Sequence, residues 1–199
     1  MATTLLLIRH AAHDLLGKAV AGRASGLSLN AHGREEALQL AERLSTAPIA
    51  AVYSGPLERV RETAAPLAQR LGLTPRVDAG LHEIDFGAWT GRTFAELDAD
   101  AMWPVWVNRR SEAHPPGGET IPAVQRRIID TIERLRRAHG AEMVALVSHG
   151  DVIKAALAAY LGMSLDGLER FDIAPASVSI LACGDGWSKV TQLNGLSYR

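Results

Sequence analysis

Three apolar runs of the chain each end in polar side chains that bind anions or carry protons. In chain order these side chains are Arg9 and His10, Ser54 with Arg59 just beyond it, and His149 followed by Gly150. Guanidinium groups bind phosphate oxygens through paired hydrogen bonds, and a neutral imidazole can attack phosphorus and hold the phosphoryl group covalently. Arginines and a second histidine can neutralise the developing charge, so that no metal ion is needed. The residue types therefore indicate phosphoryl transfer.

Cleavage of a phosphate ester also requires a proton for the departing oxygen. A carboxylic acid is the expected source, and Glu83 lies in the segment 81–87 before an apolar patch. Partial burial would favour the protonated form of this side chain, because burial disfavours a charged carboxylate.

The three polar groups can meet only if the apolar runs before them are neighbouring strands of one parallel sheet. The runs cover residues 4–8, 49–53 and 143–147, and each is short and suited to burial on both faces. In an open α/β sheet, ligands bind beyond the carboxyl ends of the strands. We therefore predict an α/β fold, a three-layer sandwich whose mainly parallel central sheet is flanked by helices.

Residues that cap helix N-termini, and glycines that end helices, predict the helices around these strands. The expected helices run from the Asn30 cap to about residue 45, from Pro56 to Gly72, near 94–101, from the Thr120 cap to Gly140, over 152–161, and after a Ser164 cap. A short strand is expected at 76–78. A terminal hairpin over 178–182 and 189–193 would add an antiparallel edge to the sheet.

Length, charge and cysteine content limit the classes of partner. The 199 residues fit a single domain, 1–199, with an excursion over the site at about 81–118. The net charge of −1 gives no general attraction to nucleic acid or to an anionic membrane. The single Cys183 excludes an internal disulfide, and the first apolar run is too short to cross a membrane and follows no basic leader. We therefore expect a cytoplasmic protein with no nucleic-acid or membrane partner, and a homodimer stays open.

Other large side chains of the excursion are expected to be structural. Trp89, Trp103 and Trp106 are predicted to pack beneath it rather than to form a stacking platform. The pair Arg109-Arg110 could meet an anionic end of the substrate, but a solvated pair is the favoured interpretation.

Six short motifs follow one another along nearly the whole chain. They are RHA at 9–11, LNAHG at 29–33, YSGPLERVRETA at 53–64, LHEIDFGAWTG at 81–91, PGGET at 116–120 and VSHG at 147–150. Each motif is weak alone, but together and in this order they are specific. The series resembles the histidine phosphatase superfamily, also called the phosphoglycerate-mutase-like family.

The resemblance implies a role for each of the central residues. It implies that His10 is phosphorylated, that Arg9, Arg59 and His149 hold the phosphoryl group, and that Glu83 is the proton donor. The implied activity is that of a histidine acid phosphatase-type enzyme, a metal-independent phosphomonoester hydrolase that needs no cofactor and takes a small phosphorylated substrate. Further candidate substrate contacts are His13, Arg23, Ser54 and Gly150.

The chain departs from the family pattern near the expected rim of the site. Ala11 and Ala12 replace the usual Gly-Glu, Leu16 stands where many members have a phosphate-contacting Asn, and Thr90 replaces a frequent Glu. These departures bear on the identity of the substrate more than on the chemistry.

Two alternative functions stay open. A cofactor-dependent phosphoglycerate mutase would use the same residues, but mutases of the family are usually longer after the motif at 81–91. A non-catalytic phospho-ligand-binding regulator is suggested by Ala11 and Ala12. It is opposed by the retention of the four phosphate-site residues, Arg9, His10, Arg59 and His149, and of Glu83.

Overall fold

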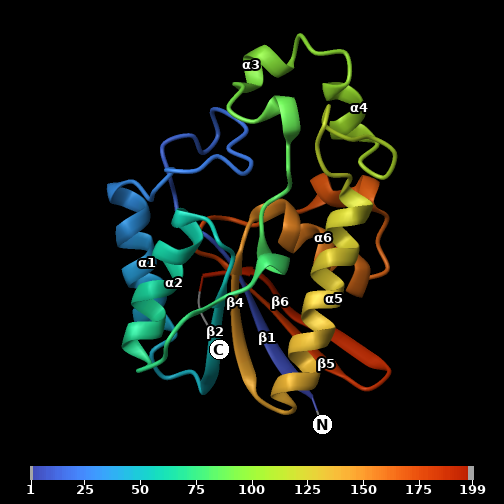
Figure 1. Ribbon diagram of the computed structural model, residues 1–199. Coiled ribbons are helices and arrows are strands. Elements are labelled where there is room, and N and C mark those ends of the chain that lie inside the picture. The colour runs from blue at the N-terminus through green and yellow to red at the C-terminus, as the bar shows by residue number, and fades with distance from the viewer. Residues whose placement is uncertain (1, 197–199) are drawn as a thin grey trace.

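A six-stranded sheet with the strand order β3-β2-β4-β1-β5-β6 forms the centre of the computed structural model, which describes residues 2–196 (Figure 1). Its strands are β1 (Thr3–Arg9), β2 (Ile49–Ser54), β3 (Arg76–Val77), β4 (Met143–Ser148), β5 (Val178–Gly184) and β6 (Trp187–Gly195). The first four strands in this order run parallel, whereas β5 and β6 are antiparallel to their neighbours. The predicted mainly parallel sheet with an antiparallel terminal hairpin is therefore confirmed.

The strand order brings the three polar groups to one edge of the sheet. β4 lies between β1 and β2, and its residue Ser148 pairs with Arg9 while Val147 pairs with Ser54. The carboxyl ends of these strands therefore lie level with one another, as the sequence predicts.

Helices cover both faces of the sheet (Figure 1). The four long helices are α1 (Ala31–Arg43), α2 (Glu58–Arg70), α5 (Ile121–His139) and α6 (Gly150–Tyr160). Side chains alternate between the faces along a strand, so Leu6 and Ile8 of β1 share one hydrophobic core with α1 and α2. Leu5 and Leu7 share the other core with α5 and α6. This burial on both faces confirms the three-layer arrangement.

The helix ends follow from local chemistry, with small corrections. The side chain of Asn30 accepts a hydrogen bond from the Gly33 amide at the start of α1, and Thr120 does the same for Ala123 at the start of α5. Pro56 lies outside α2, which begins at Glu58 rather than at the proline. The segment after the Ser164 cap forms the 3-10 helix η3 (Leu165–Arg170).

The excursion rises above the carboxyl edge of the sheet and carries two short helices (Figure 1). The 3-10 helix η1 (Ala79–Leu81) leads into it, and its elements are the 3-10 helix η2 (Gly87–Trp89), α3 (Phe94–Leu97) and α4 (Trp103–Asn108). The helix expected over 94–101 ends at Leu97, and the sequence prediction missed α4. Trp89 and Trp106 are buried with their ring centroids 5.9 Å apart, so both tryptophans pack within the excursion as expected.

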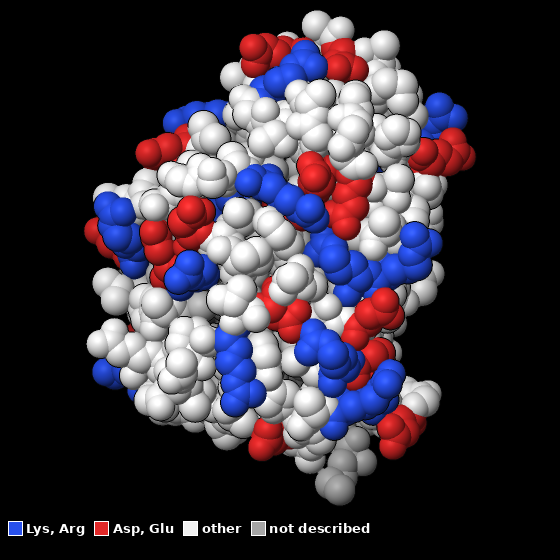
Figure 2. Space-filling view, in the orientation of Figure 1, with Lys and Arg blue, Asp and Glu red and all other residues white. Residues whose placement is uncertain are grey.

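Among the residues described, no helix is long and apolar enough to cross a membrane. On the face shown in Figure 2, Lys and Arg side chains alternate with Asp and Glu without forming a broad area of one sign. Attraction of a charged ligand therefore depends on local clusters.

Candidate active site

A cavity of about 570 Å³ opens at the carboxyl edge of the sheet, below the excursion. The predicted residues that line it are Arg9, His10, His13, Glu83 and Gly150. Two further predicted residues, Arg59 in the first turn of α2 and His149 at the N-cap of α6, are fully buried beside these groups. The structure thus brings together all five residues assigned to phosphoryl transfer, from four separate segments of the chain.

His10 is held in the protonation state that a nucleophile requires. Its Nδ1 atom lies 2.8 Å from the carbonyl oxygen of Ala11. Because a carbonyl oxygen only accepts hydrogen bonds, Nδ1 carries the ring proton and Nε2 carries the free electron pair. Burial, together with the charges of His149 and Arg59, holds the pKa of His10 well below its usual value. The ring is therefore neutral at neutral pH.

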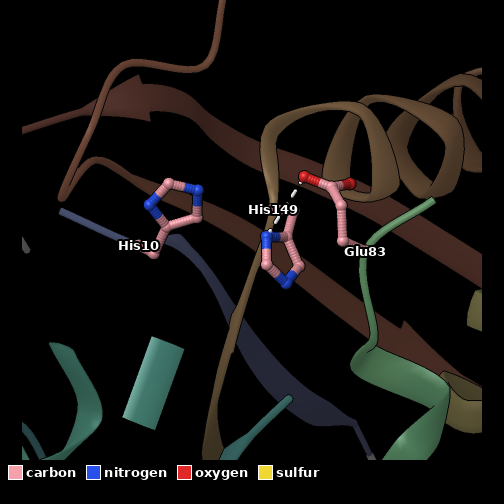
Figure 3. A group of neighbouring side chains, drawn as sticks. All are labelled: His10, Glu83 and His149. Carbon is pink, nitrogen blue, oxygen red and sulfur yellow. Dashed lines mark ion pairs between the residues drawn. The ribbon is translucent and has the colours of Figure 1, made fainter. Parts of the chain in front are cut away.

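The carboxylate of Glu83 is buried against the ring of the second histidine (Figure 3), whose pKa is lowered by burial although Glu83 opposes this shift. Its Oε2 atom lies 3.2 Å from Nδ1 of His149 and 3.9 Å from Nη2 of Arg59. Burial alone would raise the pKa of Glu83, but His149 and Arg59 outweigh it and lower the pKa to about 2. The expectation that burial keeps this carboxyl protonated is wrong, because the sequence does not show which cations face it.

Several hydrogen-bond donors around His10 are buried without a partner among the residues described. These atoms are Nε of Arg9, Nε and Nη1 of Arg59, and Nε2 of His149, which donates only when its ring is protonated there. The remaining donors of the arginines are engaged, since Nη1 of Arg9 donates to the Ile173 carbonyl and Nη2 of Arg59 donates to that of Gly22. Unpaired buried polar groups are costly. A ligand rich in acceptor oxygens would pair them.

The main chain adds a further positive contribution. α6 begins at Gly150 with no side chain capping its first amides, and the N-terminus of a helix attracts anions. A Cβ atom at Gly150 would lie 3.3 Å from Nε of Arg9. Glycine therefore lets the helix start approach the guanidinium group closely.

His10, Glu83 and His149 also lie close enough together to hold a metal ion, with ligand atoms within 4.8 Å of one another. The arginines beside them oppose this. Burial lowers the pKa of both Arg9 and Arg59, yet a guanidinium group stays protonated in proteins. Two permanent positive charges disfavour a cation at this place and favour an anion.

Two of the candidate substrate contacts lie elsewhere. Ser54 is buried at the end of β2 and lines a separate hollow with Glu58 and Arg61, so the side chain does not reach the cavity. Arg23 is used within the protein, because its Nε donates to the Glu83 carbonyl at 2.8 Å and its Nη2 to Glu119 at 3.0 Å. Arg23 therefore positions the main chain of Glu83.

Sequence reasoning missed a second group of charged residues in the same cavity. Arg110, expected to be solvated, is buried and lines the cavity together with Asp151 and Lys154. The sequence could have indicated Lys154, because a lysine within the apolar sequence of α6 is buried only beside polar or charged groups. Arg110 carried no such signal, because its ion-pair partners Asp151 and Glu169 are distant in the sequence.

Burial of neutral histidines at this site predicts a loss of stability in acid. Burial, with Arg59 and Arg9 nearby, lowers the pKa of His13 from 6.5 to about 4. The unfolded chain therefore binds a proton first, so the contribution of His13 to stability is lost as the pH falls from about 6.5 to about 4. We expect His13→Asn to lose less in Tm over this interval than the wild type. Equal losses in the two proteins would contradict this, and His114→Gln, at an exposed position, is the matched control.

Comparison with known proteins connects this geometry to a family. The sequence profile of the histidine phosphatase superfamily (branch 1) matches residues 5–195. Phosphoserine phosphatase 1 of Hydrogenobacter thermophilus is 29% identical over 195 residues, which cover 96% of this chain and 91% of that protein. Bifunctional protein Rv2228c of Mycobacterium tuberculosis is 36% identical over 98% of this chain, but this chain spans only 55% of its length.

A solved structure supports the same assignment. Mycobacterial glucosyl-3-phosphoglycerate phosphatase Rv2419c superposes with a TM-score of 0.89 at 29% sequence identity, over 98% of this chain and 100% of that one. The similarity thus extends over the whole described fold, including the excursion.

Proposed function

Because this chain belongs to the histidine phosphatase superfamily, we propose that it is a metal-independent phosphomonoester hydrolase that works through a phosphohistidine on His10. The observation that supports this most strongly is the set of unpartnered buried donors of Arg9 and Arg59 around a neutral histidine, with Nε2 of His149 buried beside them. A phosphoryl group offers three acceptor oxygens and negative charge to such a set. The phosphatases among its relatives support hydrolysis as the reaction class.

In the first step, Nε2 of His10 attacks phosphorus opposite the leaving oxygen. The bond between phosphorus and that oxygen breaks as the bond between phosphorus and nitrogen forms, and the departing oxygen takes a proton from Glu83. Arg9 and Arg59 stabilise the charge on the phosphoryl oxygens. His10 keeps its Nδ1 proton, because Nδ1–H donates a hydrogen bond to the Ala11 carbonyl.

The proton on Glu83 comes with the substrate. Among the protein's own groups the carboxylate is ionised, since His149 and Arg59 face it. A bound phosphate ester places new negative charge beside these groups and so raises the pKa of Glu83. A substrate that binds as the monoanion carries the necessary proton, which passes to the carboxylate within the site.

In the second step, water replaces the alcohol. Glu83, now a carboxylate, accepts a proton from the water as its oxygen attacks phosphorus. The bond between phosphorus and Nε2 breaks, and the electron pair returns to His10. Inorganic phosphate takes the proton from Glu83 and leaves as the monoanion, so Glu83 is again a carboxylate and His10 is again neutral.

Hydrolysis of p-nitrophenyl phosphate in the presence of excess EDTA tests this proposal. We expect turnover to be unchanged by the chelator, because arginines rather than a metal ion carry the phosphoryl charge. Loss of turnover in EDTA, restored by a divalent ion, would contradict a metal-independent reaction. Failure to hydrolyse any phosphomonoester, with phosphate still binding, would favour a phospho-ligand-binding protein instead.

A further inference from the structure

The cavity extends beyond the phosphoryl site into a second region of charged side chains, which we call the distal region. It is formed by Arg110, Asp151, Lys154, Glu169 and Asp172. Lys154 follows Gly150 by one helical turn, about 6 Å further along α6. A leaving group several bonds long would therefore reach from the phosphoryl site to the distal region.

Two cationic side chains of the distal region are buried yet incompletely paired. Arg110 and Lys154 each expose only 9% of their side chains. Nε of Arg110 has no hydrogen-bond partner among the residues described. Nζ of Lys154 lies 3.8 Å from Glu169 and 3.9 Å from Asp172, which is beyond hydrogen-bond distance. Both groups can donate to a ligand in the cavity.

The carboxylates of the distal region are placed to accept hydrogen bonds from the same ligand. Asp151 lies 3.1 Å from Nη1 of Arg110, and Glu169 pairs with Nη2 of the same guanidinium group. Asp172 exposes 93% of its side chain. Donor and acceptor side chains thus both line this part of the cavity.

The mixed charge of the distal region disfavours simple ions as its ligand. Its two cationic and three anionic side chains leave a net charge of about −1. A second phosphate or carboxylate would face three carboxylates, whereas a lone ammonium group would face two cations. A hydroxyl group donates one hydrogen bond and accepts others, so it suits neighbouring carboxylate and cationic groups together.

Aromatic side chains line the cavity on the excursion side. The exposed Phe94 and the half-buried Trp103 contribute to it, together with the buried Phe86 and Trp106, and Arg110 lies 5.3 Å from the centre of the Trp106 ring. The C–H face of a sugar or polyol packs against such surfaces, while its hydroxyl groups turn to the charged wall. The cavity of about 570 Å³ is also much larger than a phosphate group requires.

From these observations we infer that the distal region binds the polyhydroxylated alcohol of a sugar phosphate or sugar-alcohol phosphate, with Lys154 and Arg110 as specificity-determining residues. The inference rests on the proposed function, because it names the leaving group for the phosphoryl site described above. The hydroxyl groups accept from Lys154 and Arg110 and donate to Asp151 and Glu169.

The test compares two phosphates of equal chain length, sorbitol 6-phosphate and n-hexyl phosphate, which differ in their hydroxyl groups. Calorimetric titration of the His10→Ala variant measures both dissociation constants without turnover. Hydrogen bonds to charged groups contribute about 1.5–3 kcal/mol each, so we expect sorbitol 6-phosphate to bind at least about tenfold more tightly. Adding Lys154→Met should lower this preference about tenfold, and Lys154→Arg should retain most of it.

Lys189→Met is the matched control, because Lys189 is exposed on β6 and should leave the preference unchanged. Equal affinities for the two phosphates, or a preference insensitive to Lys154→Met, would overturn the inference. Tighter binding of phosphoserine than of sorbitol 6-phosphate would also overturn it, in favour of a zwitterionic ligand. Turnover of p-nitrophenyl phosphate by the wild type is measured separately, so a failure of the hydrolase proposal is distinguishable from a failure of this one.

Should His10→Ala fold poorly, the same comparison is made with the wild type. The ratio of kcat/KM for the two phosphates then replaces the ratio of dissociation constants. We expect the ratio to favour sorbitol 6-phosphate and to fall about tenfold in Lys154→Met. A ratio of one in both proteins would overturn the inference.

Discussion

Replacing His10 by alanine is expected to abolish phosphomonoester hydrolysis while leaving phosphate bound. The variant removes the only atom proposed to attack phosphorus, Nε2 of His10, but keeps the cationic groups of Arg9 and Arg59. Loss of a nucleophile from a covalent enzyme costs on the order of 10⁶-fold in kcat. Turnover should therefore fall below detection with every phosphomonoester that the wild type cleaves.

Thermal unfolding with and without inorganic phosphate provides the control for His10→Ala. A ligand that binds only the folded state raises Tm, so phosphate should stabilise the variant as it stabilises the wild type. Arg59→Met should instead lose this stabilisation, because Arg59 provides two of the unpartnered donors. Wild-type turnover in a folded His10→Ala variant would show that the nucleophile is another group.

Replacing Glu83 by glutamine is expected to slow alkyl esters much more than p-nitrophenyl phosphate. Glutamine keeps the size of the side chain but has no proton to transfer. An alkoxide needs that proton as the ester bond breaks, whereas p-nitrophenolate leaves largely unaided. General acid catalysis contributes about 10²–10⁴-fold to the rate. The loss of rate on the alkyl ester should therefore exceed the loss on p-nitrophenyl phosphate by a factor in this range.

The pH dependence of the alkyl ester follows from the charge of Glu83. Its pKa of about 2 beside His149 and Arg59 means that the proton enters with the substrate monoanion, whose second ionisation has a pKa of about 6. The rate at which the wild type hydrolyses an alkyl phosphate should therefore fall as the pH rises above about 6. The Glu83→Gln variant should lack this fall.

Steady-state kinetics on both kinds of ester measures the effect of Glu83→Gln. Asp85→Asn is the matched control, since Asp85 is a neighbouring carboxylate that does not line the cavity and accepts from the Gly87 amide. Equal slowing of both esters by Glu83→Gln would indicate a binding or structural role. If Asp85→Asn instead slowed hydrolysis of the alkyl ester much more than that of p-nitrophenyl phosphate, Asp85 would be identified as the acid.

Local patterns in the sequence predicted the parts of the fold that depend on neighbouring residues. The aliphatic run before Arg9 indicates a buried strand, and the Asn30 and Thr120 caps locate the starts of α1 and α5. The convergence of Arg9 and His149 follows from the rule that parallel strands end at one edge.

The remaining features depend on partners that the sequence does not connect. The low pKa of Glu83 comes from His149, which lies 66 positions further along the chain and contacts it only in the fold. Arg110 resembles any exposed arginine until Asp151 and Glu169 are placed beside it. α4 is short and begins with Trp103-Pro104, so it lacks the length needed for a helical pattern.

The central claim, covalent catalysis by His10, is tested most directly by trapping the phosphoenzyme. Glu83→Gln is mixed with p-nitrophenyl phosphate, quenched in alkali to preserve phosphohistidine, and mapped by mass spectrometry. Because this variant loses the base for the second step, we predict a burst of p-nitrophenol matched by phosphate on His10, absent from the Glu83→Gln/His10→Ala double variant. Phosphate on another residue, or steady turnover with neither a burst nor labelled His10, would contradict the account.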